Sequence, residues 1–264
     1  MLTRTQEMQA LHNNETNSFY DSIAEYYHLF FRDWEATIQR EGSALRKIFR
    51  GQDVRSVLDA SCGPGTQSIA LARLDFDVTA ADPSFGMLIK ARQYAQQHNV
   101  ADDITFVRAG FLELPFALVG PYDAVITKGN ALPHLLSDAE ITQALSNFYN
   151  LLRPGGSLVI GIRDFDFLLE DRPKFVPRYA HTDDPNQDHI LFDVWDWHDD
   201  SPITVTFNTF IVSGKGEQYT ANKYPVTYRA LRREELERML GEVGFVETKA
   251  ETQLWEVVYT ARKP

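Results

Sequence analysis

Short apolar runs alternate along this chain with segments whose apolar positions recur every three or four residues. The runs predict β-strands at residues 55–60, 77–81, 103–107, 122–127 and 157–162. The intervening periodic segments predict helices at residues 66–73, 84–98 and 137–152. Because strands that alternate with helices pair in parallel, the pattern predicts a parallel sheet with helices on both faces.

The pattern differs at the start of the chain. Aromatic and aliphatic residues recur with helical spacing from Phe19 to Phe31, and a second amphipathic segment runs from Trp34 to Phe49. Two helices are therefore expected before the sheet, and residues 17–50 are interpreted as an N-terminal helical cap. Roughly the first 16 residues are polar and are expected to form a flexible tail.

The alternation of strands and helices stops between Arg163 and Tyr228. Residues 189–198 and 202–212 instead alternate with a period of two, and 218–228 is a third candidate strand. Residues 163–228 are therefore predicted to form an inserted antiparallel β-meander, which we interpret as a lid and substrate wall. A surface elaboration or a dimerisation ribbon is the alternative.

A helix at residues 231–243 and two further strands complete the pattern. The predicted fold is α/β: a Rossmann-like, doubly wound, seven-stranded, mostly parallel sheet, with an N-terminal helical cap and an inserted antiparallel β-meander. Residues 1–264 fit one elaborated domain, since 264 residues with 44% hydrophobic content can bury a full core.

Composition narrows the class of partner. The formal net charge of −11 opposes binding to a phosphate backbone, so no nucleic-acid partner is expected. No apolar run reaches the roughly 18 residues of a membrane helix, and the first residues lack a secretory signal, so we expect a cytoplasmic protein without a membrane partner. Cys62 is the only cysteine and is interpreted as a small turn residue rather than a catalytic thiol. A homo-oligomer remains open.

The most informative stretch is residues 57–68, where an apolar strand ends in Asp59 and a glycine-bracketed turn leads into a helix. Gly63 and Gly65 let a cofactor lie close to the backbone. A dinucleotide site would place a third glycine at position 68, but Ser68 stands there. The acid before the glycines, together with Asp82 at the end of the next strand for the ribose hydroxyls, favours S-adenosylmethionine over NAD.

Ligands of such sheets bind outside the carboxyl ends of the strands. The loops to consider are therefore residues 61–66, 82–84, 109–111, 128–134 and 163–166. Arg163 directly follows an apolar strand, so its guanidinium is expected to be partly desolvated and to need an anion. Asp164, Asp166 or a substrate could supply that anion.

These residues together resemble the class I S-adenosylmethionine-dependent methyltransferases over nearly the whole chain after Phe19. The resemblance rests on residues 57–68, Asp82, 106–115, 122–125 and 152–156. Within that superfamily the chain is most similar to the glycine and sarcosine N-methyltransferase type. The narrower similarity rests on residues 129–135, Arg163 to Asp166, and Tyr224 with Pro225.

The resemblance implies an S-adenosylmethionine cofactor, an S-adenosylhomocysteine product and a small-molecule methyl acceptor, namely the nitrogen of an amino acid or related amine. It also implies that Arg163 receives an acceptor carboxylate, that Asn130 and Tyr224 frame the amine, and that His134 and Tyr224 are catalytic. The implied cofactor-binding residues are Tyr20, Tyr27, Asp59, Ala60, Gly63, Gly65, Asp82, Pro83, Met87, Gly110, Phe111, Lys128 and His134. The family often has an acid for the adenine amino group where this chain has Gly110.

Several of these residues have a structural alternative: Asn130 is a common turn residue, His134 could be a core histidine, and Tyr20 and Tyr27 lie in an aromatic helix stripe. Other functions also stay open, namely O-, S- or C-methylation of an apolar metabolite, or cofactor binding without catalysis. The aromatic residues of the insert would suit an apolar acceptor. No metal is expected, because the histidines of the insert lack tight ligand spacing.

Overall fold

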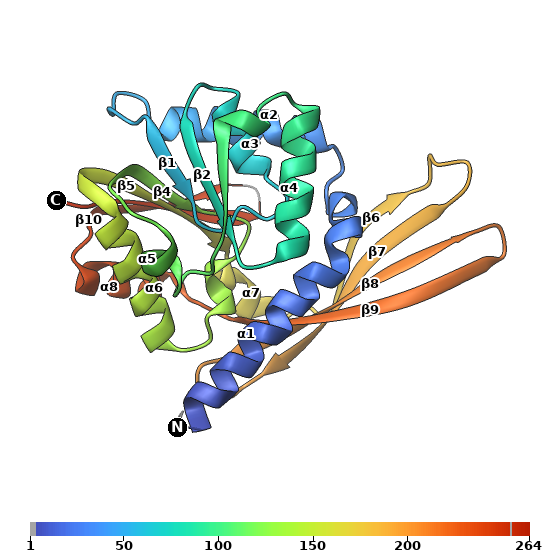
Figure 1. Cartoon of the computed structure of the whole chain (residues 1–264). Helices are drawn as coiled ribbons and strands as arrows, with labels where there is room; N and C mark the ends of the chain where they lie inside the picture. The colour runs from blue at the N-terminus through green and yellow to red at the C-terminus, as the bar shows by residue number, and fades with distance from the viewer. Residues whose placement is uncertain (1–3, 254) are drawn as a thin grey trace.

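The computed structural model describes residues 4–253 and 255–264 and has a seven-stranded sheet at its centre (Figure 1). The strand order is β3-β2-β1-β4-β5-β11-β10, in which β1 to β5 are parallel and β11 runs antiparallel to both neighbours. The strands are β1 (Ser56–Asp59), β2 (Asp77–Asp82), β3 (Ile104–Arg108), β4 (Tyr122–Thr127), β5 (Leu152–Arg163), β10 (Val246–Gln253) and β11 (Glu256–Arg262). The predicted Rossmann-like fold is confirmed.

Helices cover both faces of this sheet. One face carries α2 (Trp34–Ile48), α3 (Thr66–Ala72) and α4 (Phe85–Gln97); the other carries α5 (Leu114–Ala117), α6 (Asp138–Leu151) and α8 (Arg233–Val243). Two short 3-10 helices, η2 (Ala101–Asp103) and η3 (Leu132–His134), complete the loops. The inner strands β1, β4 and β5 carry apolar residues that are buried, such as Leu58, Val125 and Leu158, whereas the edge strand β3 is partly exposed.

The insert after β5 forms a second, four-stranded antiparallel sheet in the order β6-β7-β8-β9. Its elements are α7 (Phe165–Asp171), β6 (Phe175–His181), β7 (Asp188–His198), β8 (Thr204–Lys215) and β9 (Gln218–Arg229). The predicted β-meander is therefore present, and it extends away from the central sheet in Figure 1. Neither α7 nor β6 follows from the apolar pattern, since β6 is mostly exposed and interrupted by Pro177.

The N-terminal segment forms α1 (Arg4–Ile23) and the 3-10 helix η1 (Ala24–Phe30). The prediction of a flexible tail over the first 16 residues is therefore wrong from Arg4 onward, while residues 1–3 lie outside the described residues. Gln, Glu, Met, Ala and Leu in this stretch favour a helix although the stretch is polar. Tertiary contact supports it, because the His12 Nε2 atom lies 3.1 Å from the His134 carbonyl oxygen.

Helix α1 crosses the molecule next to α4 and β9 (Figure 1). The Asp21 carboxylate accepts hydrogen bonds from the Ser84 hydroxyl at 2.6 Å and from the Gly86 N–H at 2.8 Å. These bonds join α1 to the first turn of α4, where unpaired backbone N–H groups favour an acid. Of the helices in residues 4–253 and 255–264, none combines the length and apolarity that a bilayer crossing requires.

Candidate functional site

The glycine turn after β1 and the acid at the end of β2 form one hydrogen-bonded unit. Gly63 and Gly65 have φ of +51° and +97°, a region that glycine adopts without strain. The Asp82 carboxylate accepts the Gly63 N–H at 2.8 Å and the Ser84 N–H at 2.9 Å. Burial raises the pKa of Asp82 to about 6, against these hydrogen bonds, so the carboxylate is ionised at neutral pH.

Asp59 and Ser68 are hydrogen bonded to each other, and Ser68 stands where a dinucleotide site would have its third glycine. The Ser68 hydroxyl, which is fully buried, donates a 2.6 Å hydrogen bond to the Asp59 carboxylate. Burial raises the pKa of Asp59 to about 7, while the bond from Ser68 opposes that rise. Ser68 therefore fastens α3 to the end of β1 through a polar contact that a glycine could not make.

The remaining predicted cofactor residues around the turn are largely buried. Ala60 donates its N–H to the Ile126 carbonyl oxygen at 2.8 Å, and Met87 is enclosed in an apolar cluster that includes Phe19 and Ile23. Phe111 packs edge-on against Phe148, with ring centroids 5.5 Å apart. These residues make apolar packing contacts near the carboxyl ends of β1 to β4.

Lys128, the first residue after β4, lies in an ion cluster. Its amine is 2.7 Å from the Glu41 carboxylate and 3.0 Å from that of Glu256. Burial alone would lower the pKa of Lys128, but the two glutamates raise it above its ordinary value. Glu256 also accepts the Gly129 N–H at 3.2 Å, so the cluster holds the turn that carries Asn130.

His134 lies within an aromatic group formed by α1 and β9. The Tyr20 hydroxyl is 2.7 Å from the His134 Nε2 atom, and the ring of Tyr228 lies 4.3 Å from the imidazole, between ring centroids. Tyr27 is 6.2 Å from Tyr20, between ring centroids. Burial lowers the pKa of His134 to about 3 and raises the pKa of Tyr20 and Tyr27, so all three side chains are uncharged at neutral pH.

Arg163, the last residue of β5, projects among three aromatic rings. Its guanidinium carbon lies 5.6 Å from the Trp195 centroid, 5.3 Å from that of Phe207 and 5.2 Å from that of Trp255. Burial lowers the pKa of Arg163 to about 10, which still leaves it charged at neutral pH. Within residues 4–253 and 255–264, its side chain makes no hydrogen bond or ion pair. A desolvated cation of this kind favours binding an anion.

The acids that could have neutralised Arg163 are engaged elsewhere. Asp164 caps α7 by accepting the Phe167 N–H at 3.2 Å, and Asp166 pairs with Arg232 at 2.8 Å. The buried Asp193 on β7 pairs with Arg178 at 2.7 Å. Neither Asp164 nor Asp166, the two acids considered from the sequence, pairs with Arg163.

Asn130 lies beside Arg163. Its side-chain oxygen accepts the Arg163 backbone N–H at 3.0 Å, and its own N–H donates to the Gly161 carbonyl oxygen at 3.1 Å. Its φ of +69° is left-handed, as the turn interpretation anticipated. The Asn130 Nδ2 atom, however, is buried and has no hydrogen-bond partner among the described residues. The residue therefore shapes the turn and also presents an unused donor.

Tyr224 lies at the edge of this group. It packs with Leu29, Leu191 and Ile211 and also against the apolar cluster that includes Trp195 and Phe207. Tyr228, four residues on and on the same face of the strand, is the residue that reaches His134 and Phe207. The alternation of β9 places both tyrosines on one face, which could have identified Tyr228 as a candidate.

The sequence anticipated the aromatic wall of the site only in part: it singled out the aromatic residues of the insert but not their contact with Arg163. Trp195 and Phe207 stack 3.8 Å apart between β7 and β8, and Trp255 stands in the turn between β10 and β11. Trp195 and Phe207 lie at buried positions of the period-two pattern, which indicates their face but not their contact with Arg163. Trp255 carries no comparable signal.

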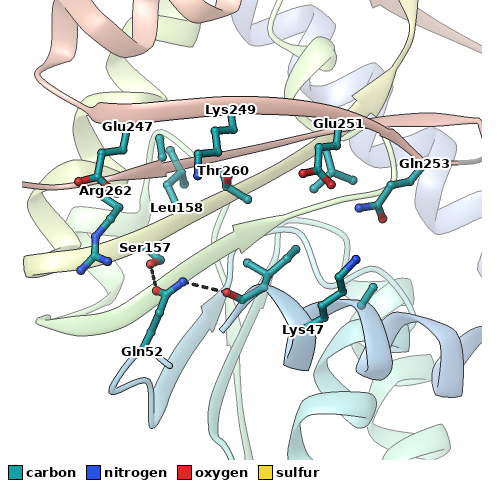
Figure 2. A pocket seen from close by; sticks show the side chains of 14 residues that line it. Lys47, Gln52, Ser157, Leu158, Glu247, Lys249, Glu251, Gln253, Thr260 and Arg262 are labelled. Carbon is teal, nitrogen blue, oxygen red and sulfur yellow. Dashed lines mark hydrogen bonds between the residues drawn. The ribbon is translucent and has the colours of Figure 1, made fainter. Parts of the chain in front are cut away.

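A separate groove of about 650 Å³ lies between α2 and strands β5, β10 and β11 (Figure 2). Its walls include Lys47, Gln52 and Ser157, of which Gln52 and Ser157 are hydrogen bonded to each other. None of the predicted site residues lines it. In the described part of the chain, no three His, Cys, Asp or Glu side chains gather in a metal-binding arrangement.

Comparison with known proteins agrees with this geometry. Residues 57–156 match a family model described as a methyltransferase domain. The chain is 32% identical to the glycine/sarcosine/dimethylglycine N-methyltransferase of Actinopolyspora halophila over 81% of its own length and 35% of that protein. It is 30% identical to the glycine/sarcosine N-methyltransferase of Parasynechococcus marenigrum (strain WH8102), over 81% of this chain and 71% of the relative.

Among solved structures, the CcbJ methyltransferase of Streptomyces caelestis superposes with a TM-score of 0.74 at 22% identity, covering 93% of this chain and 97% of that one. This likeness extends the agreement in fold through the N-terminal helices and the insert. The loop residues at the carboxyl ends of the strands, the family match and the relatives all lead to one conclusion: the chain belongs to the class I S-adenosylmethionine-dependent methyltransferases.

Proposed function

We propose that this enzyme methylates the nitrogen of a small amino acid such as glycine or sarcosine. The observation that carries the proposal is the unpaired guanidinium of Arg163, enclosed by aromatic rings at the end of β5. A carboxylate is the acceptor group that best matches a planar guanidinium, because two parallel N–H groups can donate to its two oxygens. The two relatives named above carry glycine/sarcosine N-methyltransferase in their names, which agrees.

Asn130 supports the same acceptor. Its unpartnered Nδ2 donor is fixed next to Arg163, because the Asn130 side-chain oxygen already holds the Arg163 backbone. A buried donor without a partner costs free energy unless a ligand supplies an acceptor. An amino-acid carboxylate oxygen would satisfy Asn130 and Arg163 together. This would fix the acceptor at its carboxylate end and leave the amine free to face the cofactor.

The cofactor site has the features that the adenosyl group needs. Asp82 would accept the ribose hydroxyls, while Gly63 and Gly65 give close access to the backbone. Gly63 has open space where a Cβ would stand, which leaves room for a ligand. When bound, S-adenosylmethionine supplies an activated methyl group on a positively charged sulfur, so the protein contributes mainly alignment.

His134 is better suited to orientation than to proton transfer. With a pKa of about 3, its neutral imidazole is too weak a base to take a proton from an ammonium group. Its Nε2 atom is also already engaged with the Tyr20 hydroxyl. We therefore assign His134, Tyr20 and Tyr228 to shaping a water-poor chamber, and the acceptor amine reaches it as the free base by losing its proton to solvent.

An apolar acceptor has less support. The rings that would favour it are mostly packed against each other: Trp195 stacks on Phe207, and Phe192 stacks on Phe210 with centroids 5.1 Å apart on the opposite face. Trp197 donates its indole N–H to the Pro173 carbonyl oxygen. These contacts make the aromatic residues of the insert structural rather than a free apolar wall.

The test is a methyl-transfer assay that removes the acceptor carboxylate and keeps the amine. Glycine and sarcosine would be compared with methylamine and glycinamide, and phenols would represent apolar acceptors. We expect turnover with glycine or sarcosine and a much lower kcat/KM with methylamine and glycinamide. Equal turnover of glycine and methylamine, or turnover of phenols alone, would contradict the proposal.

A further inference from the structure

The proposed acceptor chamber around Arg163 has a second arginine beside it. The Arg178 Nε atom, on β6, donates to a carboxylate oxygen of Asp193 at 2.7 Å, and its Nη2 atom lies 2.7 Å from the same oxygen. The Arg178 guanidinium carbon also lies 5.1 Å from the centroid of the Phe30 ring. Phe30 stacks on Tyr27, with centroids 5.3 Å apart, and so joins Arg178 to the aromatic residues of the N-terminal segment.

Asp193 is the anion that pairs with Arg178. Its side chain is fully buried, and it also accepts the Thr209 hydroxyl at 2.8 Å and the Trp195 indole N–H at 3.3 Å. The Trp195 ring lies next to Arg163, with 5.6 Å between the guanidinium carbon and the ring centroid. The same indole therefore contacts the carboxylate of the paired arginine and the unpaired guanidinium.

The three charged side chains influence one another. Burial is the main cause of the lowered pKa of Arg163; the positive charge of Arg178 lowers this pKa further, and the negative charge of Asp193 raises it. The group thus contains two cations and one anion, which leaves one positive charge uncompensated. Because a buried charge needs an opposite partner, this balance matches a ligand with one carboxylate.

We propose that Asp193 restricts the acceptor to monocarboxylates by keeping Arg178 from binding a ligand, so that of these two arginines only Arg163 stays free. The inference rests on the proposed function, because it takes the acceptor carboxylate to bind at Arg163. A second carboxylate on the acceptor would meet a guanidinium that already donates to Asp193. It would also approach the Asp193 carboxylate, which repels it.

The first experiment measures anion binding without turnover. Acetate and malonate, which carry one and two carboxylates, are titrated by calorimetry into the protein loaded with S-adenosylhomocysteine. The wild-type protein should bind acetate at least as tightly as malonate. Asp193→Asn releases Arg178, so malonate should gain about tenfold in affinity relative to acetate. Arg178→Gln leaves the Asp193 carboxylate unpaired near Arg163, so the affinity for acetate should fall about tenfold.

The double variant completes this cycle. Arg178→Gln/Asp193→Asn removes both charges, and its Kd values for the two anions should return towards those of the wild type. A purely structural ion pair predicts a different result, because each single change would then weaken both anions alike. Arg172→Gln and Asp199→Asn change a surface pair between α7 and the end of β7 and are the matched controls. Thermal unfolding without ligand shows which variants fold; if Asp193→Asn does not, Arg178→Gln and the double variant still decide.

Turnover provides the second readout. Iminodiacetate is sarcosine with a second carboxylate on the N-methyl carbon, so the two amines form a matched pair of substrates. Asp193→Asn should raise kcat/KM for iminodiacetate relative to sarcosine about tenfold. The double variant should lose this gain, because it lacks the released guanidinium of Arg178.

The inference is overturned if Asp193→Asn keeps the wild-type ratio of malonate to acetate affinity, or if Arg178→Gln binds acetate as the wild type does. Its failure can be told apart from failure of the proposed function. If the wild-type protein methylates sarcosine while the variants bind anions unchanged, only the role of Asp193 is wrong. If the wild-type protein methylates no amino acid, the proposed function is wrong, and the acetate and malonate titrations still decide the role of Asp193.

Discussion

Replacing Arg163 with methionine should separate substrate binding from protein stability. Methionine keeps an apolar stem among Trp195, Phe207 and Trp255 but removes the charge. A charge-assisted hydrogen bond to a carboxylate contributes about 1.5–3 kcal/mol, so the KM for glycine should rise about 10- to 100-fold. Affinity for S-adenosylhomocysteine should stay close to that of the wild type, because the Asp82 site does not involve Arg163.

The free energy of unfolding, in contrast to the KM, should change little in this variant. Burial, which lowers the pKa of Arg163 to about 10, disfavours the charged form by roughly 3 kcal/mol. Cation–π attraction to three ring centroids, 5.2–5.6 Å from the guanidinium carbon, offsets about 2 kcal/mol of this. The unliganded Arg163→Met protein should therefore unfold within about 1 kcal/mol of the wild type, or about 2–4 °C in Tm, on the more stable side.

The assay combines initial rates at varied glycine, the same rates with methylamine, calorimetry with S-adenosylhomocysteine, and thermal unfolding. The control is Arg172→Met, since Arg172 also lies over a tryptophan but pairs with Asp199 at the surface. The reasoning would be refuted if Arg163→Met lowered Tm by 8 °C or more, because Arg163 would then be a structural residue. A rise in KM that is equal for glycine and methylamine would refute it as well.

Three further predictions follow from the buried polar groups. Asp82 has a pKa of about 6 and must be ionised to accept ribose hydroxyls. The affinity for S-adenosylhomocysteine, measured by calorimetry, should therefore fall by up to about tenfold per pH unit below pH 6. Asp82→Asn should abolish this pH dependence. The raised pKa has the opposite effect on unliganded stability: its contribution is full below pH 3.8 and is lost as the pH rises through about 6. Ser68→Ala should cost about 1–3 kcal/mol in denaturant unfolding by removing the donor to Asp59, and calorimetry should show no gained NAD binding. Gly161→Ala would put a Cβ against the Glu256 carboxylate and should lower the free energy of unfolding by about 2–4 kcal/mol; a Tm unchanged within 1 °C would contradict that contact.

The sequence predicts the central sheet closely because the inner strands β1, β4 and β5 are buried on both faces and carry short apolar runs. The ends of β1 and β2 could also be located, since Gly63, Gly65 and Asp82 have roles that depend on local backbone geometry. The meander followed from its period of two. These features depend on residues close together in the chain, which is the information that periodicity carries.

The rest of the site depends on contacts between distant segments. Helix α1 begins at Arg4 although its first half is polar, because helix propensity and contact with the η3 turn outweigh low hydrophobicity. Tyr228, four residues beyond Tyr224 on β9, is the tyrosine whose ring contacts His134, and its place opposite Val205 depends on the register with β8. The engagement of Lys128 with Glu41 and Glu256 joins three elements, and no pattern along one segment encodes it.

The hydrogen bonds between Asp82 and the two backbone N–H groups of Gly63 and Ser84 have a consequence for affinity. They fix the glycine turn before any ligand arrives, so binding need not order that loop and loses less conformational entropy. The proposed acceptor chamber is built differently, from α1, the β-meander and the β10–β11 turn around Arg163. Substitutions in that chamber should alter the choice of acceptor while the cofactor site around Asp82 stays rigid. Acceptor specificity can therefore diverge, or be engineered, without changes to the cofactor site.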